Sequence, residues 1–221
     1  MRPFARATTA AIVLGLYYWF LIAFPFNQPT GAADTQVDRD ILASRTLFET
    51  GRFAEALPPT ERLTKEMASQ PTFHERLARI YHELNRFADE ARAWETVMAL
   101  SPTPIDACPM VAHAYQRAGD SAQELAALER CSSLPPLDPD FLLMLGQALL
   151  RADRKVEARQ AFERGLELDS RYPDLHLLLG VRQFDDREPA AARRSFERFL
   201  ELAPSRRDEV AAWLKRTGSV K

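Results

Sequence analysis

The sequence predicts an all-helical protein in which helix pairs stack into an elongated array behind one N-terminal membrane helix. Only 8 glycines against 27% charged residues, in a 221-residue chain rich in Ala, Leu, Glu and Arg, favour helices. The segment FERGLEL at 162–168 recurs 34 residues later as FERFLEL at 196–202, which is typical of repeated helical units. A long apolar run near the N-terminus stands apart from this pattern.

The apolar run extends from Ala10 to Phe26. Arg2 and Arg6 precede it, and charges resume at Asp34. About 20 residues are therefore available, enough to cross a hydrocarbon core of about 30 Å. Because the basic residues precede the run, the positive-inside rule places the N-terminus in the cytoplasm and the rest of the chain across the membrane.

This run has two interpretations. One is an uncleaved signal anchor, and the other is a signal peptide cleaved after the small residues at 31–33. We favour the anchor because the apolar stretch is longer than a typical signal-peptide core. The prediction is a basic flank at 1–6, a transmembrane signal anchor at 7–26 and a linker at 27–36. This places a single-pass protein in the inner membrane of a bacterium, with its repeat domain in the periplasm.

The 34-residue period continues along the chain without insertions. Units in register begin at Val37, Pro71, Ile105, Pro139 and Pro173. Position 8 is always small: Ser44, Ala78, Ala112, Gly146 and Gly180. Position 15 holds mostly turn formers: Gly51, Asn85, Gly119, Asp153 and Arg187. Position 24 holds mostly large residues: Thr60, Trp94, Leu128, Phe162 and Phe196.

These positions have a physical interpretation as a helix pair. Positions 4, 7, 8 and 11 share one face of a first helix. The small residue at 8 lets a second helix approach, the residue at 15 reverses the chain, and the large residue at 24 fills the gap. Proline near position 32 ends the second helix. Each pair leaves an apolar face that the next pair covers.

This pattern resembles the tetratricopeptide repeat, whose signature is large-x-x-Leu-Gly-x-x-Tyr, then Ala-x-x-x-Phe, then Pro. The resemblance implies a right-handed α-solenoid of about five helix pairs. The predicted array spans 37–206, with units 37–70, 71–104, 105–138, 139–172 and 173–206. Ser205 to Asp208 has capping-box spacing, so we expect a capping helix at 207–217 and then a tail at 218–221.

Two departures from the signature affect the second helices. Pro58-Pro59 falls inside the second helix of unit one, so that helix starts at Pro58 or is kinked there. Units two and three carry Glu90 and Glu124 at position 20, where units four and five carry alanine. We therefore expect their second helices to be shifted by one residue.

The resemblance implies a partner-binding groove lined by positions 2, 5, 6, 9, 12 and 13 of the first helices. The residues predicted to contact a partner are Arg76, Arg79, His82, His113, Arg117, Leu143, Leu150, Leu177, Val181 and Phe184. The first half is polar and the second is mostly apolar, which suits a partner segment with an apolar stretch and an acidic or carboxylate end. Alternatively, the leucines pack against neighbouring helices and the arginines are only solvated. The Lys and Asn clamp for carboxylates known in the family is not present.

Cys108 and Cys131 occupy positions 4 and 27 of unit three, which face each other in an antiparallel helix pair. Outside the cytoplasm they would form a disulfide. The alternative is two buried thiols that fill small core positions.

The sequence offers no pattern for catalysis, metal or cofactor binding. His74, His82, His113 and His176 form neither HExxH nor HxxxH, and GxSxG, Walker and dinucleotide-binding motifs are absent. Two of these histidines, His74 and His176, stand at position 4, where packing is the better interpretation. A net charge of −2 does not favour nucleic-acid binding. We expect no enzyme, no metal, no cofactor and no small-molecule substrate.

The predicted function is therefore a membrane-anchored interaction scaffold or assembly factor that binds a peptide or protein partner. Cytochrome c maturation, translocon-linked folding and envelope assembly are examples of such roles. The alternative is a cleaved, soluble periplasmic subunit of a larger envelope complex. An enzyme with an unrecognised site is a third hypothesis, disfavoured because no catalytic cluster is seen.

Overall fold

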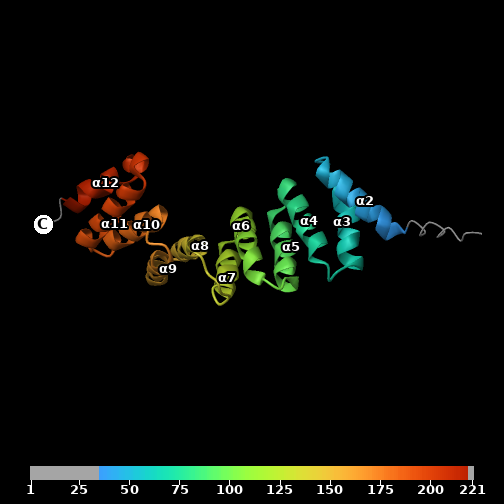
Figure 1. The fold of residues 1–221 in the computed structure, drawn as a ribbon, viewed down its shortest axis with the longest axis horizontal. Coiled ribbons are helices and arrows are strands. Elements are labelled where there is room, and N and C mark those ends of the chain that lie inside the picture. The colour runs from blue at the N-terminus through green and yellow to red at the C-terminus, as the bar shows by residue number, and fades with distance from the viewer. Residues whose placement is uncertain (1–34, 219–221) are drawn as a thin grey trace, which may run out of the picture.

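The computed structural model describes residues 35–218, and their regular structure is entirely helical (Figure 1). The five helix pairs are α2 (Gln36–Glu49) and α3 (Phe53–Glu66), α4 (Pro71–Glu83) and α5 (Phe87–Leu100), α6 (Cys108–Ala118) and α7 (Ser121–Cys131), α8 (Pro139–Arg151) and α9 (Lys155–Leu168), and α10 (Pro173–Asp185) and α11 (Pro189–Leu202). Short 3₁₀ turns, η1 (Pro104–Ala107) and η2 (Pro204–Arg206), precede α6 and the last helix, α12 (Arg207–Gly218).

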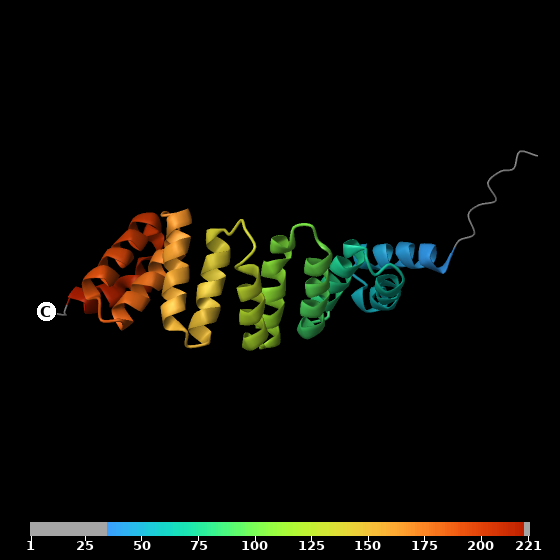
Figure 2. The same ribbon diagram turned by 90° about the horizontal axis from the view of Figure 1, so that it is seen from below.

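The pairs stand in one row, and each contacts the pair before it and the pair after it (Figure 2). The prediction of an all-helical array of stacked pairs is confirmed. The predicted basic flank, the signal anchor at 7–26 and nearly all of the linker lie outside the described residues. Between residues 35 and 218, no helix combines the length and the apolar character needed to span a bilayer.

The turn between the two helices of each pair is built on position 15. The five residues there have positive φ: 74° at Gly51, 56° at Asn85, 76° at Gly119, 60° at Asp153 and 63° at Arg187. A residue in the left-handed backbone conformation ends a helix and changes the direction of the chain. The turn prediction is thus confirmed in every unit, including the one in which arginine must adopt this conformation.

Close approach within a pair depends on the small residue at position 8. A Cβ atom added to Gly180 would lie 2.6 Å from Cε1 of Phe196, and one added to Gly146 would overlap the ring of Phe162. Both rings are fully buried. The second helix therefore places its large residue directly on the backbone of the first, as the repeat pattern predicts.

The second helix of unit one neither starts at Pro58 nor is delayed by it, so the predicted start there is wrong. Helix α3 begins at Phe53 and continues through Pro58 and Pro59 to Glu66. Helical φ suits the proline ring, and the carbonyls that lose their partners belong to Ala54 and Glu55. These residues lie in an exposed first turn, where solvent can reach the carbonyls.

The predicted one-residue shift in units two and three is also wrong. Helices α5 and α7 begin at position 17 of their units, as α3, α9 and α11 do. Glu90 and Glu124 instead stay in the alanine position and are buried, at 6% and 3% exposure. Burial of a carboxylate requires a partner, and each of them has one on a first helix.

The predicted capping box at Ser205 is replaced by a 3₁₀ turn. Pro204 opens η2, which includes Ser205, and α12 begins only at Arg207. A capping box does form at the start of α2, where Thr35 and Asp38 exchange hydrogen bonds. The last helix covers the array as expected, because Val210 is fully buried against Phe196 and Phe199.

Unit three contains a disulfide between Cys108 and Cys131, with their Cα atoms 6.2 Å apart. Both residues are fully buried, and the sulfur of Met98 lies 3.8 Å from each Sγ. The bond therefore joins α6 to α7 inside the core, next to a residue of α5.

Candidate functional site

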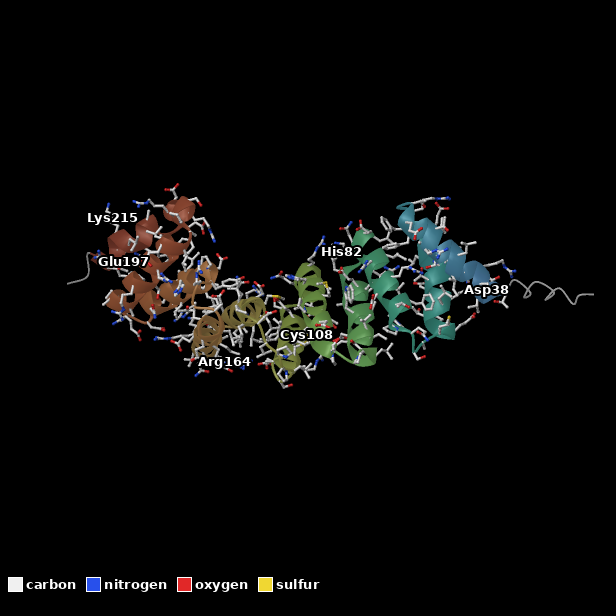
Figure 3. All side chains as sticks on the ribbon, in the orientation of Figure 1. Asp38, His82, Cys108, Arg164, Glu197 and Lys215 are labelled. Carbon is white, nitrogen blue, oxygen red and sulfur yellow. A yellow bond between two sulfur atoms is a disulfide. The ribbon has the colours of Figure 1, made fainter. Side chains whose placement is uncertain are left out.

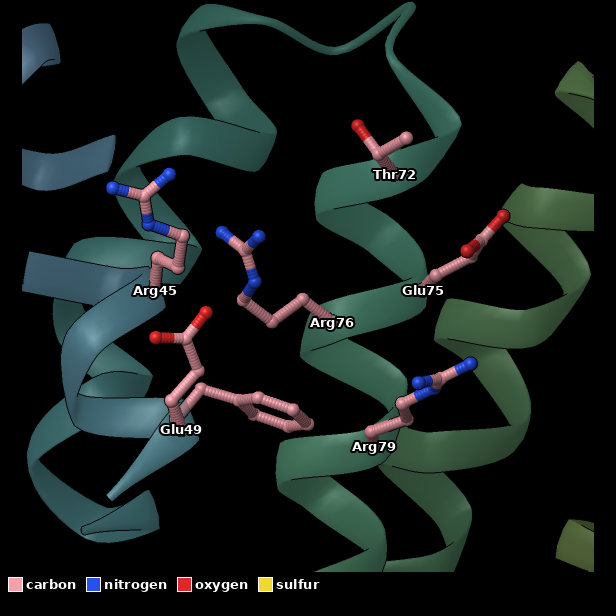
Figure 4. Close-up of a pocket in the computed structure, with 7 residues that line it drawn as sticks. Arg45, Glu49, Thr72, Glu75, Arg76 and Arg79 are labelled. Atoms are coloured by element: carbon pink, nitrogen blue, oxygen red, sulfur yellow. The ribbon is translucent and has the colours of Figure 1, made fainter. Parts of the chain in front are cut away.

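Two adjoining pockets lie along the first helices of units one to three. The first, of about 310 Å³, is lined by Arg45, Phe48, Glu49, Thr72, Glu75, Arg76 and Arg79 (Figure 4). The second, of about 510 Å³, is lined by Phe48, Arg79, His82, Glu83, Glu90, Trp94, Met110, His113, Gln116 and Arg117. Phe48 and Arg79 form the shared wall. Apart from Glu90 and Trp94, each of these residues stands at a position expected to line the groove.

The structure thus brings together the polar half of the predicted groove. Arg76 and Arg79 line the first pocket, while Arg79, His82, His113 and Arg117 line the second. Three consecutive units contribute, since these side chains come from α4 and α6 and the shared Phe48 from α2.

The first pocket concentrates positive charge between α2 and α4. The guanidinium groups of Arg45 and Arg76 both extend into the space between these helices (Figure 4). Arg76 donates a hydrogen bond to the Ser44 hydroxyl at 3.2 Å. Burial, followed by the neighbouring charge of Arg45, lowers the pKa of Arg76, and Glu49 opposes this only in part.

No carboxylate of residues 35–218 forms an ion pair with Arg45, Arg76 or Arg79. This contrasts with Arg62, whose guanidinium donates to Asp40 at 2.6 and 2.8 Å. The first pocket therefore holds cations that remain available to an anion from outside the chain.

The second pocket has a buried carboxylate at its floor. His82, labelled in Figure 3, lies in the last turn of α4, and its Nδ1 is 3.0 Å from Glu90. Its Nε2 is 3.0 Å from Nη1 of Arg117. The guanidinium must donate, so Nε2 accepts, and the imidazole carries its proton on Nδ1 and donates it to Glu90.

Arg117 is held in place from a second side. Its guanidinium carbon lies 4.0 Å from the centroid of the Phe87 ring. Glu90 and Arg117 thus both contact His82, and Arg117 also lies over the Phe87 ring. The apolar part of this pocket's lining is Phe48, Trp94 and Met110, the last being 42% exposed. The other polar lining residues are Arg79, Glu83, His113 and Gln116.

Sequence reasoning missed Glu90 and Trp94 as members of the site. Both lie on a second helix, whereas the groove was expected from first helices alone. The available signal was a carboxylate at a position where three other units carry alanine. Such a residue is buried only if a neighbouring group pairs with it.

The apolar half of the predicted groove has a different environment. Leu143 and Leu150 are partly buried against the central core, whereas Leu177, Val181 and Phe184 pack against the cluster beneath α12. The Phe184 and Trp213 ring centroids are 5.2 Å apart. The three residues of α10 thus contact the apolar cluster at the C-terminal end of the array.

The two histidines at position 4 bond to the preceding unit, and His74 is buried whereas His176 is partly buried. Nε2 of His74 lies 3.0 Å from the carbonyl oxygen of Ala68, and Nε2 of His176 lies 2.9 Å from that of Ser170. Each histidine therefore ties a first helix to the end of the preceding unit. Across residues 35–218, no group of three or more His, Cys, Asp or Glu side chains could hold a metal ion.

The family model of the tetratricopeptide repeat matches residues 41–103 and 110–173. No curated protein matches the sequence.

Several solved structures share the fold. YrrB, described as a TPR protein with an unusual peptide-binding site, is 16% identical, with a TM-score of 0.66 over 86% of this chain and 98% of its own. MamA from Desulfovibrio magneticus RS-1 is 18% identical, with a TM-score of 0.61 over 77% and 97%. A thermophilic TPR protein from Thermus thermophilus is 19% identical, with a TM-score of 0.51 over 83% and 100%.

Proposed function

This chain belongs to the tetratricopeptide repeat family, and we propose that it is a membrane-anchored scaffold or assembly factor that binds a segment of a partner protein. The binding site is the groove formed by α2, α4 and α6. One observation carries this proposal: two adjoining pockets are lined by groove positions of three consecutive units. A row of pockets along neighbouring helices suits an extended peptide. The likeness in fold to YrrB, a protein described by its peptide-binding site, supports the same use of this surface.

Anchoring rests on the apolar run at 10–26 with its basic flank. It would confine the array to the periplasmic face of the inner membrane, where confinement raises the concentration of partners. The disulfide of unit three supports an oxidising compartment. The partner's identity then decides among cytochrome c maturation, translocon-linked folding and envelope assembly.

The test is photocrosslinking in cells from Gln116, an exposed residue that lines the second pocket. Arg194, exposed on the second helix α11, serves as the matched control position. We expect one dominant protein adduct from position 116 and none of that mass from position 194. Equal labelling from both positions, or no protein adduct from position 116, would rule out the groove as the binding site.

The same cells distinguish the anchor from the cleaved alternative. An anchored chain stays in the membrane pellet after carbonate extraction and keeps its first residues. A soluble chain that begins near Asp34 would reject the anchor and favour the soluble periplasmic subunit.

A further inference from the structure

We propose that the groove selects a partner segment with an acidic side chain about three residues away from a large apolar side chain. The acid would occupy the first pocket, between Arg45 and Arg76, and the apolar side chain would occupy the second, among Phe48, Trp94 and Met110. This inference rests on the proposed function and specifies the chemistry of the partner.

The first pocket fits a single carboxylate. Two guanidinium groups from adjacent helices extend into the same space, and the hydrogen bond made by Arg76 goes to a neutral hydroxyl (Figure 4). A carboxylate between them would relieve their mutual repulsion and could accept charge-assisted hydrogen bonds from both. Glu49 and Glu75 also line this pocket, so its three arginines leave one net positive charge. That balance suits a monoanion better than a phosphate dianion.

The second pocket fits an apolar group because Phe48, Trp94 and Met110 line it and its buried carboxylate, Glu90, already has a partner. Glu90, His82 and Arg117 form a continuous chain of hydrogen bonds at the floor. A cationic ligand that approaches Glu90 would have to compete with these contacts. The exposed thioether of Met110 is flexible and polarisable, and it can adapt to aromatic or branched aliphatic side chains.

The spacing follows from the shared wall. The pockets lie side by side on successive first helices, with Phe48 and Arg79 between them. Successive first helices touch through side chains, as Arg117 does with His82. The axes of touching helices are about 8–10 Å apart, and an extended chain advances about 3.3 Å per residue. An extended segment therefore passes from one pocket to the next in about three residues.

The probe is a phage-displayed library of random nonapeptides, panned against the full chain in detergent micelles. We expect enriched sequences to pair Asp or Glu with Phe, Leu, Trp or Met at a separation of two to four residues. The variant Arg76→Gln should lose this enrichment, and Arg194→Gln, which removes the same charge from a distant exposed site, should keep it.

The contact between the acidic residue and Arg76 is then tested with the best peptide, whose affinity is measured by fluorescence anisotropy. Replacing its acidic residue with the amide, or Arg76 with Gln, should each weaken binding about tenfold. The two changes together should cost little more than either one, because they remove the same interaction. Losses that multiply to about a hundredfold would overturn the assignment of the acid to Arg76. The same test applies to the second pocket, with Met110→Gln in the protein and alanine at the apolar position of the peptide. These two changes together should also cost little more than either one.

These outcomes separate the two proposals. Enriched peptides that block the crosslink from Gln116 but lack an acid would overturn the inference and leave the groove as the binding site. Failure to enrich any groove-dependent peptide, together with a dominant crosslinked protein, would also overturn the inference, since that partner would not bind through a short extended segment. Absence of both peptides and crosslink would reject the proposed function itself.

Discussion

The guanidinium of Arg151 on α8 lies 2.5 Å from the carboxylate of Glu124, which is buried on α7. This ion pair joins unit four to unit three. One unit earlier, Arg117 on α6 reaches Glu90 on α5 through His82. Both arginines stand at position 13 and both glutamates at position 20. The same two positions thus form a polar contact across successive unit boundaries.

Removal of one partner of this contact should destabilise the array. In Arg151→Met, the Glu124 carboxylate stays buried without its cation, and its Oε2 already has no hydrogen-bond partner. We expect the free energy of unfolding to fall by about 1–3 kcal/mol. Adding Glu124→Ala should recover most of this loss, because alanine is fully buried at this position in unit four, as Ala158. Urea denaturation measures the cycle, and strictly additive losses would contradict a direct pair.

Substitution of Gly146 by alanine should overpack the fourth pair. The new Cβ would overlap the ring of Phe162, which is fully buried and cannot move freely. We expect a loss of about 1–3 kcal/mol in unfolding free energy. The double variant Gly146→Ala with Phe162→Leu reproduces the combination found in unit three, Ala112 with Leu128. It should be more stable than the single variant, and a less stable double variant would show that the overlap is not the cause.

Replacement of Arg187 by a residue that tolerates positive φ should stabilise the protein. Its φ is 63°, and a side chain with a Cβ atom pays about 1–2 kcal/mol in this region. Arg187→Gly should raise the unfolding free energy by about 0.5–1 kcal/mol, because the greater entropy of glycine in the unfolded chain offsets part of the relieved strain. Thermal unfolding measures this gain as a higher midpoint temperature. Arg187→Ala removes the guanidinium and keeps the Cβ, so it should give no comparable gain. Equal gains from both would assign the effect to charge.

Two tyrosines should make stability depend on alkaline pH. The hydrogen bond to Asp140 raises the pKa of Tyr172 to about 12, and burial, with the hydrogen bond to Glu61, raises the pKa of Tyr81 to about 12. In the unfolded chain both titrate near 10. The folded state therefore keeps protons that the unfolded state releases. The stabilisation is complete below about pH 10 and is lost as the pH rises towards 12.

Urea midpoints measured between pH 8 and 11.5 test this expectation. Tyr172→Phe and Tyr81→Phe should each flatten the decline, and the double variant should flatten it further. An unchanged slope in the double variant would attribute the decline to other groups.

Loss of the disulfide should destabilise the array without changing its fold. The bond links residues that are 23 positions apart, and closing a loop of this length stabilises by about 3 kcal/mol in the chain-entropy model. Cys108→Ala with Cys131→Ala should lower the unfolding free energy by about that amount, and its stability should not respond to reductant. Because both cysteines are fully buried, the native protein should resist reductant until it unfolds. Rapid reduction of the folded chain would contradict this picture.

Features set by local sterics could be predicted from the sequence. The turn at position 15 recurs in every unit, and a small residue that faces a large one, as Gly180 faces Phe196, recurs along the chain. The repeat pattern therefore identifies both features. Their causes lie within a single helix pair. The polar half of the groove was instead implied by the family resemblance, and predicted residues such as Arg79 and His82 line one pocket.

Features that depend on contacts between units could not be predicted. Glu90 and Glu124 predict a shifted helix because the arginines linked to them lie on the next unit. Arg151 contacts Glu124 directly, and Arg117 reaches Glu90 through His82. The half-buried state of Phe184 likewise depends on how α12 docks, through Trp213. The first relationship occurs at only two unit boundaries, and the second has no counterpart in the other units.

The covalent link in unit three also affects how the array comes apart. In a row of units that contact only their neighbours, structure is lost most readily from the two ends. Helices α6 and α7 are tied to each other at the middle of the row, so fraying from either side should slow when it reaches them. The wall of the groove formed by α6 would then outlast the wall formed by α2. A chain under thermal or proteolytic stress would release the arginine end of its groove first and keep the end lined by Met110 and Arg117 the longest.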